Sequence, residues 1–388
     1  MNNLLLKKEE IKTPTLLRIL ICFYFFLCFF EPYLNGVLGS VGKYYIFVVI
    51  LALLLFHKKF YFQSYHVCFI LWFAYKILTA VWTPNETVFG LHILSHIGMT
   101  ALLLAITIVH IDKKTLWGIV YTTFLSSFAI GVLSLFFSEP YLYKNQSRMV
   151  LTLFNCQIDP NNQAVFLLMG ISIAIYFLFY LKKHRVLSLI VLLINTYSIF
   201  LTGSRGGLVS FIAMLLIILL VTERKMSFKE VSYKLGLVLF GVVLLYYITK
   251  NFLPIEIFER IFTFAEYEGG SERIIIWKRA FRLLSEKANW IFGAGWGSLY
   301  GYAGGYDAGH NTYISMLCDV GIIGSILFFV PIFSIASYLL KEKQVLPLLL
   351  LVSGLIPCFF LDAINKRFFW NPIIFAILWY NLYKKIRM

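Results

Sequence analysis

Long apolar runs recur along the whole chain, and short polar or basic stretches separate them. Each run of about 16–25 residues is near the length that crosses a bilayer as an α-helix. The pattern therefore predicts an all-α polytopic membrane protein with about twelve transmembrane helices. The predicted helix cores are 16–31, 41–56, 65–82, 90–110, 115–137, 162–181, 186–202, 208–222, 235–250, 312–340, 345–361 and 368–383.

The connections between these segments divide the predicted protein into three parts. Helices 1–9 fall in residues 1–250, and helices 10–12 fall in residues 312–388. Between them, residues 251–311 form a large external loop, and a loop of this length in a compact protein is usually functional. Residues 365–367 could form a re-entrant element instead of a simple connection.

Composition agrees with this interpretation and excludes several classes. The chain of 388 residues is 60% hydrophobic and only 14% charged, whereas soluble domains are about 25% charged. Its 38 Phe, 24 Tyr and 8 Trp suit the two membrane interfaces. The six cysteines are scattered without a C-x-x-C pair, so nothing indicates a disulfide scaffold or a zinc site. A soluble enzyme and a disordered chain are excluded.

The net charge of +15 indicates orientation in a membrane, not a nucleic-acid partner. Basic residues gather in clusters that alternate with pairs of apolar segments, as cytoplasmic loops do. We therefore expect cytoplasmic termini, contacts with membrane lipids and no nucleic acid. The clusters are Lys7, Lys8, Lys12 and Arg18; Lys58 and Lys59; Lys113 and Lys114; Lys182, Lys183 and Arg185; Arg224, Lys225, Lys229 and Lys234; Lys341 and Lys343; and Lys384, Lys385 and Arg387.

The external loop breaks this charge rule, because it also carries several basic residues. Ser271 is the expected N-cap of a helix over 273–284. Its apolar face would hold Ile276, Trp277, Phe281 and Leu284, opposite Arg279, Arg282 and Glu286. Two compatible interpretations remain: an interfacial amphipathic helix at the lipid headgroups, or a helix that presents cations to a lipid-linked phosphate.

Two arginines are candidates for binding phosphate. Arg205 lies in Gly203-Ser204-Arg205-Gly206-Gly207, at the turn between two apolar helices. A guanidinium at that depth is costly unless it pairs, lines a wet cavity, binds a carbonyl or reaches outward. Arg273 opens the basic helix of the loop. Arginine binds phosphate oxygens in a bidentate manner, so two arginines can hold a diphosphate without a metal ion or other cofactor.

His310 is the candidate acid–base residue. It lies in Gly309-His310-Asn311, where the long loop enters the next helix. Histidine titrates nearest neutrality and can accept a proton from an attacking hydroxyl. The alternative is a helix cap or a simple hydrogen-bond donor. Nearby, Gly293-Ala294-Gly295-Trp296-Gly297 lacks the strand-turn-helix context of a nucleotide-binding fingerprint, so we do not interpret it as one.

The order of these motifs resembles one known family. GSRGG, RIIIWKRA, FGAGWG and HNTYISMLCDVGIIG follow one another around the largest external loop. This order resembles the O-antigen ligase and Wzy-type polysaccharide polymerase family, which are bacterial GT-C glycosyltransferases. The resemblance covers the chain from about Asp159-Pro160-Asn161-Asn162 to Gly324, whereas the N-terminal spans agree only in topology.

The resemblance implies an activity and roles for residues. The expected donor is a glycan linked to undecaprenyl diphosphate, transferred with inversion and without metal at the outer face of the bacterial inner membrane. Arg205 and Arg273 would grip the diphosphate, and His310 would orient or deprotonate the acceptor hydroxyl. Arg279 and Arg282 are further substrate-binding candidates by position alone. Tyr313 is another candidate, being close in sequence to His310.

The acceptor remains open at this stage. A polymerase joins one lipid-linked repeat to another and would work with a chain-length regulator, whereas a ligase transfers the glycan to lipid A–core. The modest size of the external loop favours the polymerase. A flippase for the same glycan is a third possibility, because Lys76, Arg205, Asp319 and Asp362 could line a pathway. Against it, the sequence has no internal repeat and no matched pair of broken helices.

Overall fold

The computed structural model describes residues 12–57, 60–84, 86–141, 148–220, 232, 236, 247, 250–262, 270–300, 302 and 309–387. The chain is mostly helical (78%). Its longer helices are α1 (Thr15–Leu38), α2 (Val41–Phe56), α3 (Ser64–Leu78), α4 (Glu86–Ile108), α5 (Lys113–Phe137), α6 (Pro160–Tyr176), α7 (Arg185–Leu201), α8 (Arg205–Leu220), α10 (Ile255–Phe262), α11 (Gly270–Arg282), α12 (Thr312–Lys341), α13 (Val345–Leu355) and α14 (Arg367–Arg387). Short 3-10 or π-helical turns extend four of them: η1 (Thr79–Trp82), η3 (Phe177–Leu181), η4 (Leu283–Lys287) and η5 (Ile356–Phe359).

Most predicted apolar segments coincide with these helices. Among the described residues, five helices are long and apolar enough to cross a membrane: Thr15–Leu38, Ser64–Trp82, Lys113–Phe137, Pro160–Leu181 and Thr312–Lys341. The total of about twelve spans stays a prediction, since several other apolar helices are shorter. The first helix runs beyond the predicted end at 31, because Pro32 is accommodated within α1. Nearly all of the predicted segment 235–250 lies outside the described residues.

Helix α6 lies at the centre of the bundle. Asp159 caps its N-terminus and Pro160 occupies the first turn, a favoured pairing of residues at a helix start. Its side chains from Gln163 to Ile175 are buried, and α5, α7, α8 and α13 pack around it. A helix that is apolar all round is expected to be buried in this way. The start of α6 is therefore a rigid support for the residues near it.

A small antiparallel sheet departs from the expected all-α architecture. Strands β1 (Ser138–Pro140), β2 (Met149–Leu153) and β3 (Cys156–Gln157) pair in that order. Phe154 and Asn155 both have positive φ, at 52° and 59°, as a two-residue hairpin turn requires. The Gln163 side chain accepts from the backbone N–H of Leu151 at 3.0 Å. The sheet is thereby fixed to α6.

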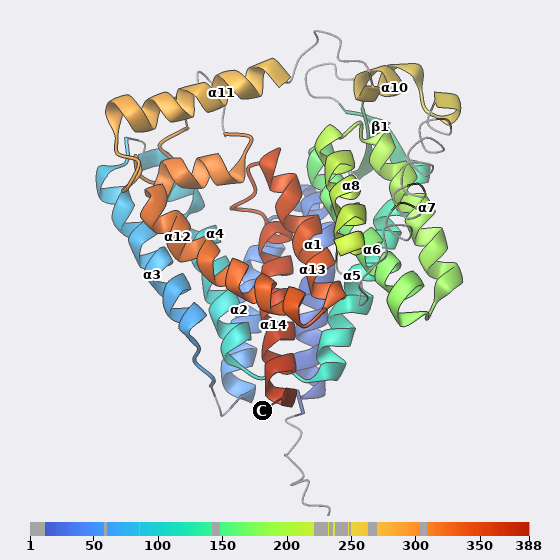
Figure 1. The fold of residues 1–388 in the computed structure, drawn as a ribbon, viewed down its shortest axis with the longest axis horizontal. Coiled ribbons are helices and arrows are strands. Elements are labelled where there is room, and N and C mark those ends of the chain that lie inside the picture. Colours follow the sequence, from blue (N-terminus) through green and yellow to red (C-terminus); the bar gives the residue numbers. More distant parts are fainter. Residues whose placement is uncertain are drawn as a thin grey trace, which may run out of the picture.

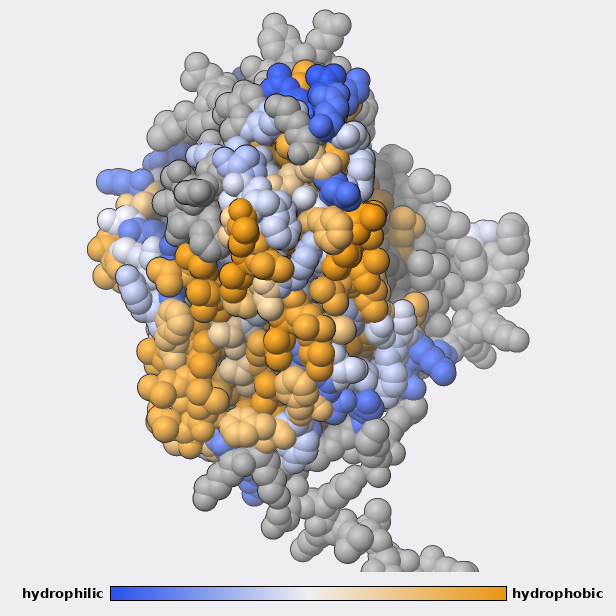
Figure 2. All heavy atoms as spheres, turned by 90° about the vertical axis from the view of Figure 1, so that its left-hand side faces the viewer, coloured by the Kyte–Doolittle hydropathy of each residue, from blue (hydrophilic) through white to orange (hydrophobic). Residues whose placement is uncertain are grey.

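A broad apolar surface surrounds the bundle. Figure 2 shows a hydrophobic band below a hydrophilic end. The exposed apolar side chains on three helices include Val48, Leu51, Leu54 and Leu55 of α2, Val67, Ile70 and Leu71 of α3, and Ile322, Ile326 and Val330 of α12. An apolar surface of this extent fits contact with lipid.

Helices α10 and α11 lie at the end of the bundle opposite the C-terminus (Figure 1). Helix α11 and the following turn η4 pack against the protein: Ile276 and Ala280 of α11 and Leu284 of η4 are buried in a cluster that includes Cys318 of α12. This contact places one side of α11 against the protein, while Ile274 and Ile275 stay exposed. The position of the helix at the lipid headgroups stays a prediction. The helix begins at Gly270, so Ser271 lies in its first turn and is not the N-cap.

Candidate functional site

The glycine-rich turn before α8 sets the position of Arg205. Gly203 has φ of 57°, in the left-handed region that favours glycine. The Ser204 hydroxyl accepts from the N–H of Gly207 at 3.1 Å and so caps α8. The same hydroxyl donates to the Asn161 side chain at 2.7 Å, which ties the turn to α6. Arg205 is thus the first residue of a capped and anchored helix.

Arg205 binds a backbone carbonyl, one of the alternatives that its sequence context left open. Its Nε and Nη2 donate to the carbonyl oxygen of Arg260 at 2.9 and 2.6 Å. Arg260 lies in the last turn of α10, where helix carbonyls lack partners within the helix. The contact joins α8 to α10 and brings a second arginine close to the turn.

Arg148 is a third arginine at this place. A Cβ built on Gly203 would lie 3.2 Å from Cδ of Arg260 and 3.5 Å from Cγ of Arg148. Burial, together with the charges of Arg260 and Arg273, lowers the pKa of Arg148 to about 10, against the opposing effect of Asp159. Its Nη2 donates to the Asn161 side chain at 3.5 Å. Its buried Nε has no hydrogen-bond partner among the described residues.

Arg273 approaches the same place from α11. Burial lowers the pKa of Arg273; Asp159 raises it and the nearby charge of Arg205 lowers it further. Its guanidinium carbon lies 5.9 Å from the centre of the Phe360 ring, within the range of a cation–π contact. Arg148, Arg205, Arg260 and Arg273 are called the arginine cluster below. The fold therefore brings Arg205 and Arg273 together, as the sequence predicts.

Asp159 is the acidic residue whose charge acts on the arginine cluster. One of its carboxylate oxygens accepts the backbone N–H groups of Asn161 at 2.8 Å and of Asn162 at 3.3 Å. A carboxylate that caps a helix uses part of its hydrogen-bonding capacity on the backbone of that helix. Like charges nevertheless act on Arg148 and Arg273, from Arg260 and Arg273 on the first and from Arg205 on the second. Such a place suits an anion with several oxygens, for example a phosphate or diphosphate.

His310 lies beside α11, at the start of α12. The Trp277 indole, one turn after Arg273, donates to the carbonyl of Gly309 at 3.2 Å. The cap of α12 is Asn311, whose side-chain oxygen accepts from the N–H groups of Tyr313 and Ile314 at 3.0 and 3.1 Å. The alternative of His310 as the helix cap is therefore wrong. His310 has an exposed side chain and φ of 46°, an unusual backbone for a non-glycine residue.

The other predicted substrate-binding residues have varied surroundings. Arg279 is half-buried on α11. Arg282 is exposed and pairs with Glu286 at 3.6 Å. The Tyr313 hydroxyl donates to the carbonyl of Leu355 at 2.6 Å, and its ring centre lies 4.4 Å from that of Phe359. The substrate-binding role of Arg279, Arg282 and Tyr313 stays a prediction.

A buried ion pair holds the loop after α11. Nζ of Lys76 lies 3.5 Å from Oδ2 of Asp319 and 3.1 Å from Nε2 of His96. The other oxygen of Asp319 accepts the N–H of Gly297 at 2.9 Å. In the same loop Gly293 has φ of 81°, and a Cβ there would lie 2.5 Å from the backbone nitrogen of Gly321. The glycines of this motif thus serve close backbone packing.

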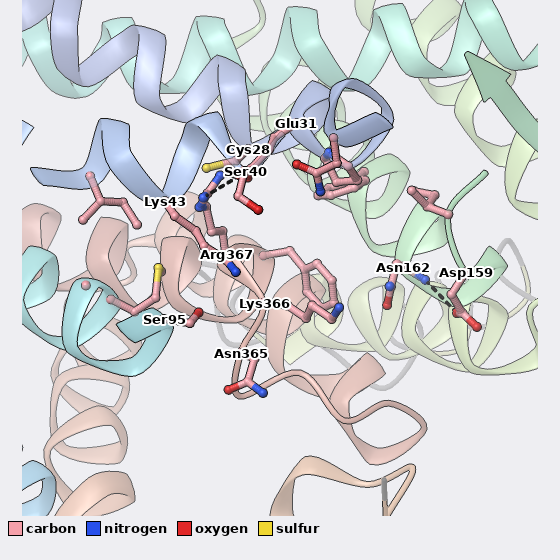
Figure 3. A pocket seen from close by; sticks show the side chains of 18 of the residues that line it. Cys28, Glu31, Ser40, Lys43, Ser95, Asp159, Asn162, Asn365, Lys366 and Arg367 are labelled. Atoms are coloured by element: carbon pink, nitrogen blue, oxygen red, sulfur yellow. Dashed lines mark hydrogen bonds and ion pairs between the residues drawn. The ribbon is translucent and has the colours of Figure 1, made fainter. Parts of the chain in front are cut away.

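A cavity of about 500 Å³ has Asp159 in its wall (Figure 3). Its walls come from α1, α2, α4, the start of α6 and the segment before α14. Asp159 lines this cavity and also acts electrostatically on Arg148 and Arg273. The cavity and the arginine cluster are therefore neighbours. The polar residues of the wall include Glu31, Asn35, Ser40, Lys43, Ser95, Asn162, Asn365, Lys366 and Arg367.

Sequence reasoning did not single out Arg148, Arg260 or the cavity. Arg260 counts among the basic residues of the external loop, and Arg148 lies in another connection that the topology places outside. Basic residues on that side run against the usual charge bias. This departure from the charge bias is the sequence signal that could have identified both arginines. No local pattern indicates the cavity, because its walls come from distant parts of the chain.

The fold and the arginine cluster define a helical membrane protein with a concentrated cationic site at one end of its bundle. Residues 189–329 match the family model described as O-antigen ligase. The recognition of the O-antigen ligase and Wzy-type polymerase family is thereby confirmed, and this segment holds Arg205, Arg260, Arg273 and His310. The group is glycosyltransferase-like, with ligase or polymerase function. No curated protein matches the chain.

Proposed function

We propose that this protein transfers a glycan from undecaprenyl diphosphate to a sugar hydroxyl at the outer face of the bacterial cytoplasmic membrane. The observation that carries the proposal is the convergence of Arg205 and Arg273 on one place. Arg205 comes from the turn before α8 and Arg273 from α11 in the long loop, and Arg205 acts electrostatically on Arg273. The guanidiniums gathered there match a diphosphate held by a lipid.

The arginine cluster would act on the leaving group. When the acceptor oxygen bonds to the anomeric carbon, the bond from that carbon to the diphosphate oxygen breaks, and the diphosphate takes the electron pair. Guanidiniums already in place stabilise that developing charge without metal, and such preorganised electrostatics often dominates catalysis. Attack from the face opposite the diphosphate inverts the anomeric centre.

His310 would receive the proton of the acceptor hydroxyl. Its exposed side chain lies next to α11, the helix that carries Arg273. A neutral imidazole accepts a proton near pH 7. Asn311 caps α12 in its place, so His310 is not needed for that structural task.

The acceptor distinguishes two versions of the proposal. In the first, the protein is a polymerase that extends lipid-linked O-antigen or capsular repeats, with a chain-length regulator as a further partner; the modest external loop favours it. In the second, the protein is a ligase with lipid A–core as acceptor, and the match to the O-antigen ligase family model favours it. Both place the chemistry at the same arginines.

The location also belongs to the proposal. The C-terminus lies at the end of the bundle opposite α10 and α11 (Figure 1). Basic residues next to the C-terminus, such as Lys384, indicate that this end faces the cytoplasm. The arginine cluster would then lie at the outer, periplasmic side, where no nucleotide sugar is needed because the diphosphate activates the donor.

The test uses purified full-length protein in detergent with the undecaprenyl-diphosphate repeat unit of its own host, in the presence of EDTA. A ladder of longer lipid-linked glycans, absent with Arg273→Ala and with His310→Ala, is the expected result for a polymerase. Transfer only after lipid A–core is added would identify a ligase. Folded protein that makes neither product would refute the transferase proposal, and transport of the intact donor in liposomes would then support a flippase.

A further inference from the structure

The cavity beside Asp159 lies at the same end of the bundle as the arginine cluster. Its walls come from the last turns of α1, the first turns of α2, α6 and α14, and the N-terminal half of α4. Successive helices of the bundle run in opposite directions, so these parts meet at one end. The C-terminus of α14 lies at the other end (Figure 1).

The lining mixes apolar side chains with charged and polar ones, and its basic residues outnumber its acidic ones. Arg367 donates from Nη2 to Oε1 of Glu31 at 2.9 Å, and this ion pair largely neutralises both groups. Lys43 and Lys366 lie on the wall near it (Figure 3). Neither lysine belongs to an ion pair within the described part of the chain. Ammonium groups of this kind can donate to a carboxylate.

The cavity also holds a buried acceptor without a donor. The side-chain oxygen of Asn365 is buried and has no hydrogen-bond partner among the described residues. A buried polar group of this kind needs a partner, and a ligand can supply one. Together with Asn35, Ser95 and Asn162, Asn365 makes a wall of amides and hydroxyls. Such groups match the hydroxyls of a sugar, since each can donate and accept.

The position of these residues along the chain separates them from the family segment. Residues 189–329 contain Arg205, Arg273 and His310, but no residue that lines the cavity. The chemistry shared by the family and the walls of the cavity therefore belong to different parts of the chain. A part outside the shared segment is the suitable place for recognising a particular glycan.

We infer that this cavity is a saccharide-binding subsite for an acidic sugar of the lipid-linked glycan, a step that rests on the proposed function. The carboxylate of the sugar lies against Lys43 and Lys366, and a sugar hydroxyl donates to the Asn365 oxygen. Its volume of about 500 Å³ falls in the usual range for small-ligand pockets, about 300–1,000 Å³. Asp159 lines this subsite and also acts on Arg148 and Arg273 of the arginine cluster.

The test measures binding instead of turnover. Full-length protein in detergent is titrated by calorimetry with a free disaccharide that contains one hexuronic acid, with its neutral counterpart and with glycerol phosphate as a lipid-headgroup probe. The variants are Lys43→Gln with Lys366→Gln, and Ser95→Trp, which fills the cavity. Lys113→Gln with Lys114→Gln removes two exposed lysines at the other end as the matched control.

We expect the acidic disaccharide to bind at least about tenfold more tightly than the neutral one. A hydrogen bond between charged groups typically contributes this much to affinity. The Lys43/Lys366 variant loses this preference, Ser95→Trp abolishes binding, and the control pair retains it. Equal affinity for both disaccharides, or unchanged binding in the two cavity variants, would overturn the inference. Tighter binding of glycerol phosphate at the same lysines would overturn it too, in favour of a lipid headgroup.

A separate titration distinguishes failure of this inference from failure of the proposed function. Farnesyl diphosphate, a short soluble prenyl diphosphate, should bind wild type and the Lys43/Lys366 variant equally, and Arg273→Ala poorly. If its binding does not depend on Arg273 while the acidic disaccharide behaves as expected, the diphosphate assignment fails and the saccharide subsite stands. If only the disaccharide results fail, the proposed function stands without this subsite.

Discussion

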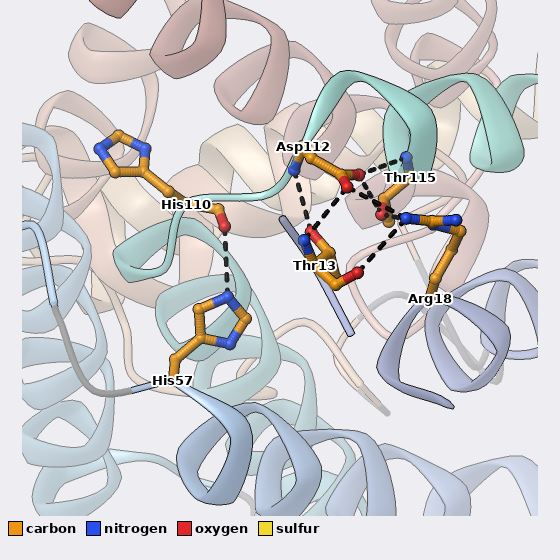
Figure 4. Close-up of polar contacts among 6 residues, drawn as sticks. All are labelled: Thr13, Arg18, His57, His110, Asp112 and Thr115. Atoms are coloured by element: carbon orange, nitrogen blue, oxygen red, sulfur yellow. Dashed lines mark hydrogen bonds and ion pairs between the residues drawn. The ribbon is translucent and has the colours of Figure 1, made fainter. Parts of the chain in front are cut away.

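Two polar clusters at opposite ends of the bundle differ in how their charges are balanced. Near the C-terminal end, Asp112 pairs with Arg18 at 3.0 Å and accepts from the N–H and the hydroxyl of Thr115 at 2.7 and 2.6 Å (Figure 4). Thr13 completes this node, since Asp112 also accepts the N–H of Thr13 at 3.1 Å. Here the Asp112 carboxylate pairs with the Arg18 guanidinium, and the donors of Thr13 and Thr115 also bind this carboxylate.

The arginine cluster gathers like charges instead. Asp159 acts on Arg148 and Arg273, but its carboxylate already caps α6. Burial and like charge lower the pKa values of Arg148 and Arg273. A charge arrangement that costs stability in the empty protein is reasonable where an anion arrives. We therefore interpret the contacts of Asp112 with Arg18, Thr13 and Thr115 as stabilising the fold, and the arginine cluster as a binding site.

Replacement of Arg273 by alanine should produce the largest contrast between the two clusters. We expect a loss of glycan transfer of about 10²–10³-fold in kcat, as when one donor to a developing oxyanion is removed. Initial rates of product formation on size-separating gels measure it. The control is Arg18→Ala, which should lower the melting temperature and leave kcat of the folded protein nearly unchanged. The comparison breaks down if the two variants behave alike.

Replacement of His310 by alanine should also act on the chemistry alone. We expect kcat to fall by about 10²-fold, the lower end of the usual contribution of a general base. The melting temperature should change little, because Asn311 provides the cap of α12. The pH–rate profile separates the roles: wild type should lose activity on acidification, and the variant should be flatter. A profile that keeps the acidic limb would assign that limb to another group.

These contrasts follow partly from sequence. Periodic apolar runs placed most helices correctly, and unusual residue types in outward turns pointed to Arg205, Arg273 and His310. Arg148 escaped notice because its role depends on a hairpin that carries it to Gly203, a tertiary contact without a local pattern. The contact between α11 and α12 has no local pattern either, since the apolar stripe around Ile276 would look the same against lipid.

Replacement of Arg148 by glutamine should separate stability from binding. Burial lowers the pKa of Arg148 to about 10, so at pH 7 the charged form carries a cost in the folded state that a neutral side chain avoids. We expect the melting temperature of the ligand-free protein to rise by about 2 °C. Inorganic diphosphate should stabilise wild type more than the variant in the same thermal scans. A lower melting temperature with unchanged diphosphate stabilisation would make Arg148 a structural residue.

Replacement of Asp112 by asparagine should have the smallest effect of the four. It should lower the melting temperature, whereas Arg148→Gln should raise it. Burial tends to raise the pKa of Asp112, but its hydrogen bonds from Thr115 and Thr13 and the charge of Arg18 lower it overall. A carboxylate with a lowered pKa stabilises the fold fully above its unfolded pKa and loses this contribution as the pH falls through the folded value. Asparagine can still cap α5, so at pH 7 we expect a cost of only about 0.5 kcal/mol from the lost ion pair with Arg18. The difference in melting temperature from wild type should shrink below about pH 4, whereas a difference that stays constant with pH would show that the charge of Asp112 does not stabilise the node.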